Sequence, residues 1–297
     1  MKYTEFDASD NANYRSYYQN CLQMTADMTP FNLLSLRGEP AFVKRAYGYG
    51  LCFHQGVLEE GKIVHFCPVG DWDSADWEAI FDAEYPAGSY FWGIPELLMK
   101  KWQKLFGDRL EIEESRDDWD YIWYTKRMVG LQGSKFKSMR GARNQFMKNY
   151  TCTEEWLTPG HFDEIRAFHR KQEMLLKERT SAVDMVEFDD ETFQTALENW
   201  DDEYLYGTIF RVDGVVAGVL INEFLDENTV VGLYQKQDRS YNGIAEYISV
   251  SDCQYLMDHG YVVCNIMSDV GSEGLRDAKM HSNPLVLLKK YKITVKY

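Results

Sequence analysis

Near the C-terminal end, three side chains have the types and spacing needed to bind an anion and to move a proton. Asp269 follows a predicted strand at 261–267, and reactive groups of open α/β sheets usually lie at strand ends. Arg276 and Lys279 are three residues apart in a predicted helix at 273–280, so they share one face. Asp269 could therefore act as a base, or it could serve only to hold Arg276.

Two glycines precede this helix and could bring its first turn close to a bound anion. Gly271 and Gly274 permit tight backbone approach, and the N–H groups at a helix start bind phosphate or carboxylate. The alternative is that both glycines only shape a turn. Together with Asn265, at the end of the preceding strand, they complete the C-terminal set of candidate anion-binding residues.

A second group of cations lies in the middle of the chain. The net charge is −15, yet residues 126–148 contain seven lysines and arginines and no acid. Arg140 and Asn144 are four residues apart in a predicted helix, and such a face can grip a phosphate, with arginine giving bidentate geometry. Alternatively, Arg140 pairs with an acid of the neighbouring domain, or the segment is a solvated face. The candidates here are Lys135, Arg140, Arg143 and Asn144.

Acyl transfer to an amine or a hydroxyl would need two further groups. One takes the proton of the nucleophile, and the other stabilises the oxyanion. Asp269 or Glu223 could be the proton acceptor. Tyr234, at the end of a predicted strand, or a backbone N–H could stabilise the oxyanion, although tyrosines at such positions more often belong to the core.

The second half of the chain predicts a regular succession of elements. Asp213-Gly214 is a strong signal for a hairpin between two strands. Helices are expected at 158–177, 189–199, 242–258 and 273–280, and strands at 204–212, 215–223, 229–235, 261–267 and 291–297. This order of two helices, a three-strand meander, helix, strand, helix and strand is similar to that of the GNAT acyltransferase fold.

The length of 297 residues suits two domains, which we place at 1–150 and 151–297. The first half repeats the order of the second only loosely and ends in the basic helix at 133–150. We therefore expect an α/β (α+β) protein of two tandem GNAT-like domains, with mixed, mostly antiparallel sheets flanked by helices. In the first half, helices are expected at 10–23, 73–81 and 94–106, and strands at 49–54, 62–67 and 120–124.

Two segments resemble signatures of the C-terminal catalytic region of phosphatidylglycerol lysyltransferases. Residues 131–146, LQGSKFKSMRGARNQF, resemble the pattern L-x-G-x-K-[FY]-x-x-K-R-N-x-x-N-x-F. Residues 265–279, NIMSDVGSEGLRDAK, resemble N-x-x-x-D-x-G-x-x-G-L-R-x-x-K, followed by a proline and a K-K-Y ending. The two segments stand in the family's order and spacing, and the similarity spans almost the whole chain.

The resemblance implies a tandem GNAT fold and aminoacyl transfer from aminoacyl-tRNA to a small-molecule or lipid-headgroup acceptor. The sequence departs from the family at two places. Ile266, Met267 and Ser268 stand where relatives carry arginine, glutamate and glutamine, and Gly141 stands where they carry asparagine. These departures bear on the substrate and on whether catalysis is retained, because they remove polar groups from the rim of the implied active site.

Coenzyme A is a less favoured donor. GNAT enzymes that use it carry a Q/R-x-x-G-x-G/A loop whose amides hold the pyrophosphate. In the stretch 237–245 only Gly243 and Ala245 match, and Ser240 stands at the Q/R position. Two alternatives to aminoacyl transfer remain, namely a coenzyme A-dependent N-acyltransferase acting on a small amine, and a non-catalytic module that binds an anion or a nucleotide.

Other classes of protein find little support in the sequence. No apolar run approaches the roughly 20 residues of a membrane helix, and the N-terminus has no signal-peptide core, so we expect a cytoplasmic protein without an integral membrane segment. The six cysteines lack a C-x-x-C pair and are expected to be buried. The histidines show no metal-ligand spacing, so no metal is expected, and His161 and His169 are interpreted as structural or surface residues.

Overall fold

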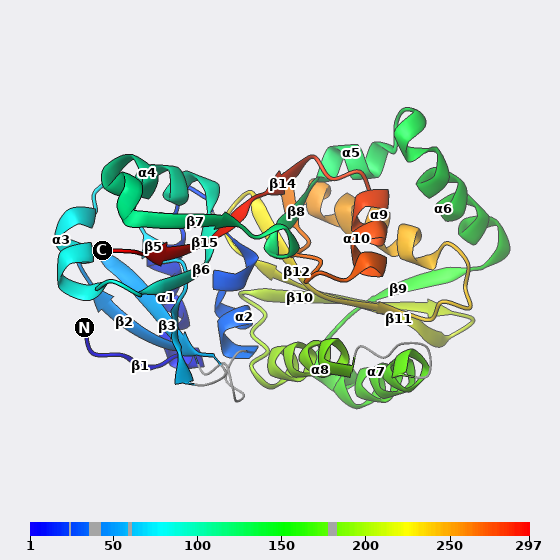
Figure 1. Ribbon diagram of the computed structural model, residues 1–297. Helices are drawn as coiled ribbons and strands as arrows, with labels where there is room; N and C mark the ends of the chain where they lie inside the picture. The colour runs from blue at the N-terminus through cyan, green and yellow to red at the C-terminus, as the bar shows by residue number, and fades with distance from the viewer. Residues whose placement is uncertain (24, 36–42, 59–60, 178–182) are drawn as a thin grey trace. The chain divides into compact units, whose positions relative to one another are not determined.

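The computed structural model describes residues 1–23, 25–35, 43–58, 61–177 and 183–297, which form two compact units (Figure 1). The first unit comprises 1–120, 268–273 and 287–297, and the second comprises 121–267 and 274–286. This division does not coincide with the expected boundary at 150. The reason is that the basic helix packs within the second unit, whereas the last strand of the chain pairs within the first.

The first unit is built on a sheet of order β1-β2-β3-β4-β6-β15-β7, with β5 paired to β3. Its strands are β1 Thr4–Glu5, β2 Lys44–Gly48, β3 Leu51–Val57, β4 Ile63–His65, β5 Val69–Gly70, β6 Tyr90–Pro95, β7 Leu110–Glu114 and β15 Lys290–Val295. Its helices are α1 Asn11–Tyr18, α2 Pro30–Ser35, α3 Trp77–Glu84 and α4 Glu96–Phe106. The expected helices and strands of this half are present, with shifted ends.

Local sequence accounts for these elements. The side chain of Asp76 caps α3 by accepting from the N–H of Ala79 at 3.1 Å, and Pro95 is the N-cap residue of α4. Aromatic rings fill the space between α3, α4 and the sheet, since Phe81 packs against Phe91 and Trp102 with ring centroids 5.9 and 5.0 Å apart.

A buried ion pair holds the last strand in this unit. Lys290 of β15 is fully buried, and its Nζ forms an ion pair with Asp120 Oδ1 at 2.7 Å and donates a hydrogen bond to Asp27 Oδ2. Burial lowers the pKa of Lys290, but the two carboxylates raise it more, so its pKa lies above its ordinary value. The lysine is therefore charged. Its ion pairs help to hold β15 in place between β6 and β7.

The second unit is built on a sheet of order β14-β8-β13-β12-β11-β10-β9, in which β12 and β13 are parallel. Its strands are β8 Asp120–Tyr124, β9 Cys152–Trp156, β10 Leu205–Val212, β11 Val215–Phe224, β12 Thr229–Gln237, β13 Val263–Asn265 and β14 Val286–Leu288. Its helices are α5 Thr125–Gly130, α6 Lys137–Asn149, α7 Phe162–Lys177, α8 Val183–Glu198, α9 Ile244–Asp258 and α10 Glu273–His281.

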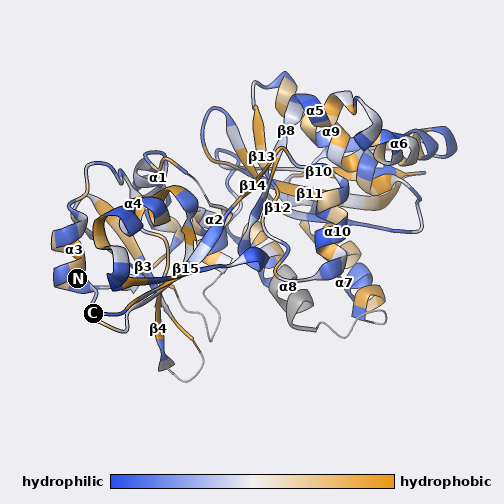
Figure 2. Cartoon of the chain, turned by 45° about the horizontal axis from the view of Figure 1, so that its top comes forward, coloured by the Kyte–Doolittle hydropathy of each residue, from blue (hydrophilic) through white to orange (hydrophobic). Residues whose placement is uncertain are grey.

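The helices of the second unit cover both faces of its sheet. Figure 1 shows α7 and α8 on one face and α5, α9 and α10 on the other. Hydrophobic residues concentrate on the strands between them (Figure 2), and Val230, Cys264 and Leu256 join β12, β13 and α9 in one buried cluster. The predicted hairpin at Asp213-Gly214 is confirmed, with φ of 52° and 79° at its two residues. The expected fold class is therefore confirmed.

Candidate functional site

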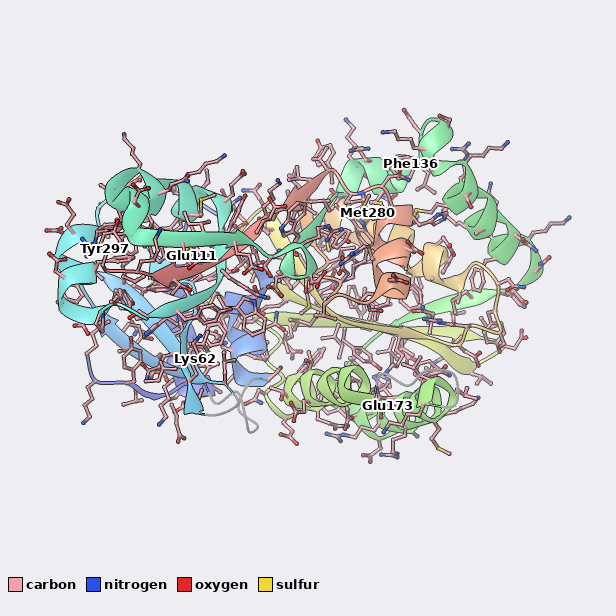
Figure 3. All side chains as sticks on the ribbon, viewed as in Figure 1. Lys62, Glu111, Phe136, Glu173, Met280 and Tyr297 are labelled. Carbon is pink, nitrogen blue, oxygen red and sulfur yellow. The ribbon has the colours of Figure 1, made fainter. Side chains whose placement is uncertain are left out.

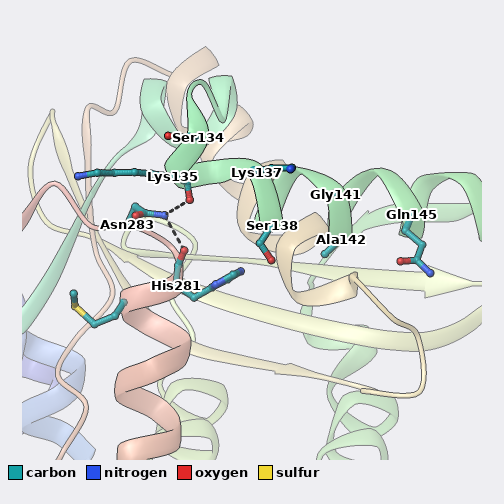
Figure 4. Close-up of a pocket in the computed structure, with 10 residues that line it drawn as sticks. Ser134, Lys135, Lys137, Ser138, Gly141, Ala142, Gln145, His281 and Asn283 are labelled. Atoms are coloured by element: carbon teal, nitrogen blue, oxygen red, sulfur yellow. Dashed lines mark hydrogen bonds between the residues drawn. The ribbon is translucent and has the colours of Figure 1, made fainter.

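The second unit has an open cavity of about 720 Å³ between the first half of α6 and the end of α10 (Figure 4). Two lysines and a histidine contribute to its wall, which contains no acid among the described residues. The lining residues are Ser134, Lys135, Lys137, Ser138, Gly141, Ala142, Gln145, Met280, His281 and Asn283. The cavity therefore has the charge that suits an anionic ligand.

The chain before α6 is fixed by packing and by one amide. Phe136, Met139 and Phe146 are buried against the helices and strands of the unit. Asn283 Nδ2 donates to the backbone oxygen of Lys135 at 2.9 Å and to that of His281 at 3.0 Å, as the dashed lines in Figure 4 show. The start of α6 and the end of α10 are thus joined at the cavity.

Gly141 gives the cavity part of its width. A Cβ at this position would meet no described atom within 4 Å. The residue lies on the face of α6 that lines the cavity, where relatives of the resembled family carry asparagine. The departure from the family pattern therefore leaves space where another side chain would project.

The predicted cationic face of α6 is only partly available to an anion. Arg140 Nη1 donates to the backbone oxygens of Leu131 and Gly133, the latter at 3.3 Å. Arg140 thus holds the loop that follows α5. Its observed partners are backbone oxygens, whereas the alternative considered from the sequence was an acid of the neighbouring domain. Arg143 Nε is buried and makes no hydrogen bond within the described residues, and Asn144 is exposed.

The start of α9, where coenzyme A enzymes of this fold hold the pyrophosphate, is covered by α6. Gly243 caps α9 with a φ of 88°, and a Cβ there would lie 2.1 Å from the carbonyl oxygen of Ala142. Phe146 of α6 packs on Ile244 and Ile248 in the first turns of α9. Helix α6 therefore lies where a pyrophosphate would approach.

The segment after β13 is held by its own side chains. Asn265 is buried, and its Oδ1 accepts from the N–H of Met267 at 2.9 Å, while Met267 has a φ of 60°. Lys279 of α10 donates from Nζ to the backbone oxygen of Ile266 at 2.6 Å. Asn265 and Lys279, which were expected to bind an anion, therefore also shape this loop.

Asp269 lies in the first unit and has a donor on each carboxylate oxygen. Its side chain is fully buried, Oδ2 accepts from Arg116 Nη1 at 3.0 Å, and Oδ1 accepts from the N–H of Gly271 at 3.0 Å. The sequence offered Arg276 as one possible partner of Asp269, and that side chain is half-buried in α10 of the second unit. Arg116 gave no signal in the sequence because 153 residues separate it from Asp269.

The two expected glycines differ in what surrounds them. Gly271 has a φ of 77°, and a Cβ there would lie 3.1 Å from Asp117 Oδ2, so a side chain at this position would be strained. Gly274 is exposed in the first turn of α10, and a Cβ there would meet nothing within 4 Å among the described residues. The first glycine therefore serves the loop around Asp269.

The other two residues considered for catalysis lie on neighbouring strands of the second unit. Glu223 of β11 is fully buried, and Tyr234 of β12 is 2% exposed. The hydroxyl of Tyr234 is 2.8 Å from Nδ1 of His169 on α7. The structure thus brings Glu223 and Tyr234 into one sheet, whereas Asp269 belongs to the other unit.

Two polar clusters of the second unit were not found in the sequence. His169 lies with Glu173 and Asp190, a grouping that the sequence analysis did not consider. The four-residue step from His169 to Glu173 on α7 was the available signal. Asp252, Tyr206 and Asn222 form the other cluster, in which Tyr206 donates to Asp252 Oδ1 at 2.6 Å. Burial raises the pKa of Asp252 to about 7, although both partners lower it.

The two mixed sheets flanked by helices have the tandem GNAT-like architecture expected from the sequence. The chain belongs to the family described as "Phosphatidylglycerol lysyltransferase, C-terminal", because the family model matches residues 22–294. The resemblance stated from the two sequence segments is therefore confirmed. Family and fold together support an acyltransferase.

Three solved structures illustrate the likeness in fold. A conserved protein of unknown function from Bacteroides thetaiotaomicron is 21% identical, with all of both chains covered and a TM-score of 0.89. The C-terminal domain of a putative lysylphosphatidylglycerol synthetase from Agrobacterium fabrum is 14% identical, with 98% of this chain and 93% of that chain covered and a TM-score of 0.65. FemX is 10% identical over 100% and 96% of the two chains, with a TM-score of 0.62.

No curated protein matches the sequence. None of the helices in the described ranges is both long enough and apolar enough to span a bilayer.

Proposed function

We propose that the protein is an aminoacyltransferase that takes its acyl group from an aminoacyl-tRNA. Membership of the lysyltransferase family supports this reaction class. The observation that carries the proposal is the cavity beside α6, whose described lining has Lys135, Lys137 and His281 and no acid. A phosphate near the aminoacylated end of the tRNA would be bound there.

The cationic segment around the cavity suits a nucleic acid better than a small anion. Residues 126–148 contain no acid, although the whole chain carries a net charge of −15. A protein of that net charge would repel RNA over most of its surface, so contact must be local. The exposed lysines of α6 and of the turn before it supply such a local site.

The packing at the start of α9 supports aminoacyl-tRNA as the donor in preference to coenzyme A. Gly243 would have to offer the amides of the α9 start to a pyrophosphate, but Ala142 and Phe146 of α6 pack against that turn. Coenzyme A-dependent transfer to a small amine therefore remains the alternative that the cavity supports less well.

The three residues proposed for proton transfer and oxyanion stabilisation are all buried. Asp269, Glu223 and Tyr234 are each at most 2% exposed, so an acceptor would have to reach them through a movement of the chain or through a bound water. Glu223 has the advantage of lying in the same unit as the cavity. The acceptor is an amine or a hydroxyl, on a small molecule or on a lipid headgroup.

The test is the salt dependence of tRNA binding. Replacing Lys135 and Lys137 together with glutamine removes two cations, so the slope of log affinity against log salt should flatten by about one to two units. The control replaces Lys100 and Lys104, two exposed lysines of α4, and should leave the slope unchanged. An equal slope in all three proteins would contradict the proposed tRNA site.

Transfer itself is tested by offering labelled aminoacyl-tRNA and labelled acetyl-coenzyme A in parallel. We expect label to leave only the aminoacyl-tRNA in the presence of a mixture of amines and anionic lipids. Consumption of acetyl-coenzyme A alone would favour the alternative donor. Binding of tRNA without consumption of either donor would favour a non-catalytic binding module.

A further inference from the structure

One buried histidine of the second unit faces two carboxylates. His169 of α7 is fully buried, and its Nε2 is 2.9 Å from Asp190 Oδ1 and 3.3 Å from Glu173 Oε1. One ligand atom from each of the three side chains lies within 4.8 Å of the others. Tetrahedral zinc ligands stand roughly 3–3.5 Å apart, so only a small adjustment separates this group from a metal-binding arrangement.

The imidazole ring is oriented by two neighbours. Its Nδ1 is 2.8 Å from the hydroxyl of Tyr234, and its face stacks on Phe193 with a centroid distance of 4.3 Å and an angle of 19° between the planes. Metal-bound histidines are commonly held in this way, through a hydrogen bond on the nitrogen that does not bind the metal. The nitrogen directed at the carboxylates is thereby fixed as Nε2.

The carboxylates are also positioned. Glu173 follows His169 by one helical turn and is 12% exposed, so both side chains project from the same face of α7. Gln194 donates from Nε2 to Asp190 Oδ1 at 3.2 Å, and Arg166 in turn donates to Gln194 at 3.1 Å. Asp190 is 45% exposed, which leaves a route from solvent for an ion and its water.

The charges near the cluster favour a further cation. Two carboxylates meet at one imidazole nitrogen, and Lys236 Nζ lies 3.8 Å from Glu173 Oε1, beyond ordinary hydrogen-bond distance. A divalent ion would bind both carboxylates and would use the lone pair of Nε2.

We propose that His169, Glu173 and Asp190 bind a divalent metal ion, with Zn²⁺ the best match to one nitrogen and two oxygen ligands and with water as a further ligand. The cluster lies on the α7 and α8 face of the sheet, whereas the cavity lies by α6 and α10. Figure 3 shows the contrast, with Glu173 and Met280 labelled on the two sides. The ion would therefore join α7 and α8 to each other and, through Tyr234, to β12, whether or not the proposed tRNA site exists.

The experiment measures zinc bound by the full-length chain after removal of metal and addition of Zn²⁺. It uses a Cys152→Ser background, because the other five cysteines are buried. We expect about one zinc per chain and a rise in the melting temperature, since an ion that binds only the folded state stabilises it. Asp190→Asn and His169→Gln should each lose both effects. The matched control is His259→Gln, which changes an exposed histidine of the same unit.

His169 is buried, and its substitution could prevent folding, so the half-exposed Asp190 gives the decisive variant. Unchanged zinc content in Asp190→Asn would overturn the proposal, because the ion would then be bound elsewhere. Absence of zinc binding in the parent protein would overturn it as well.

Discussion

At the scale of single residues, Asp269 shows how a carboxylate that fits a catalytic pattern can be occupied by structural contacts. Both of its oxygens accept from N–H groups, one from Arg116 and one from Gly271, and the side chain has no exposed surface. To act as a base, Asp269 would have to accept a proton on an oxygen that already accepts a hydrogen bond. The loop from 267 to 271, with positive φ at Met267, Val270 and Gly271, depends on these contacts.

We predict that Asp269→Asn destabilises the protein. Asparagine has one acceptor and one donor group, so its NH₂ would face either the Arg116 guanidinium or the Gly271 N–H, and one buried hydrogen bond to charge would be lost. The expected cost is roughly 1–3 kcal/mol of unfolding free energy. Urea denaturation measures it, with Asp277→Asn, an exposed change on α10, as the control.

The same variant also examines the catalytic proposal. If the unfolding free energy of Asp269→Asn equals that of the parent while transfer activity disappears, the structural role argued here is wrong and the base role gains support. A loss of activity in proportion to the loss of folded protein would leave Glu223 as the better candidate for proton transfer.

At the scale of elements, helix α6 both lines the cavity and packs against the start of α9, and one glycine marks each of these two contacts. Gly141 leaves the cavity open, whereas the carbonyl oxygen of Ala142 lies so close to Gly243 of α9 that no side chain would fit between them. The helix is therefore free to change on the cavity side and restricted on the α9 side.

We predict opposite effects for two glycine-to-alanine changes. Gly141→Ala should stabilise the protein by about 0.5–1 kcal/mol, because alanine has the higher helix propensity and the site has room. Gly243→Ala should lower the unfolding free energy by more than about 2 kcal/mol. Alanine would be strained at a φ of 88°, and its Cβ would also clash with the Ala142 oxygen, which lies 2.1 Å away.

A third glycine separates the two causes. Gly214 has a φ of 79° in the β10–β11 hairpin, but a Cβ there would meet nothing within 4 Å among the described residues. Gly214→Ala should therefore show the cost of the backbone alone, about 1–2 kcal/mol. Equal losses at Gly214 and Gly243 in urea denaturation would mean that α6 yields easily to the new side chain.

At the scale of the whole molecule, the path of the chain decides what can fold as a unit. After the second unit is nearly complete, the chain returns so that β15 lies between β6 and β7 of the first. Its Lys290 forms ion pairs with both Asp27 and Asp120, which are distant from it and from each other in sequence. The first unit is thus incomplete until the last residues have been made.

We predict that a fragment ending at residue 150 does not fold cooperatively. It would lack β15, so β6 and β7 would each lose a paired strand, and buried Asp120 would lose its lysine. Residues 121–286, which contain the helices of the second unit and nearly all of its sheet, should by contrast melt in a single transition. Calorimetry of the two fragments beside the full chain measures both expectations, and a cooperative transition in the 1–150 fragment would contradict the first.

The sequence by itself did not predict α5, β9 or β14, but it determined most elements of the second unit, the hairpin at Asp213-Gly214 and the family. These depend on periodicity, turn residues and motifs, which are local properties of the chain. It also indicated the acid-free basic segment of α6, since charge composition needs no coordinates.

Only the tertiary structure decided the partners of individual side chains. Asp269 is bonded to Arg116, Arg140 to backbone oxygens, Lys290 to Asp120, and His169 to Asp190 and Tyr234. Apart from the Arg140 contacts, each of these joins residues at least 21 positions apart. No local pattern specifies such pairs, because they arise when strands and helices pack and their buried polar groups must find donors and acceptors.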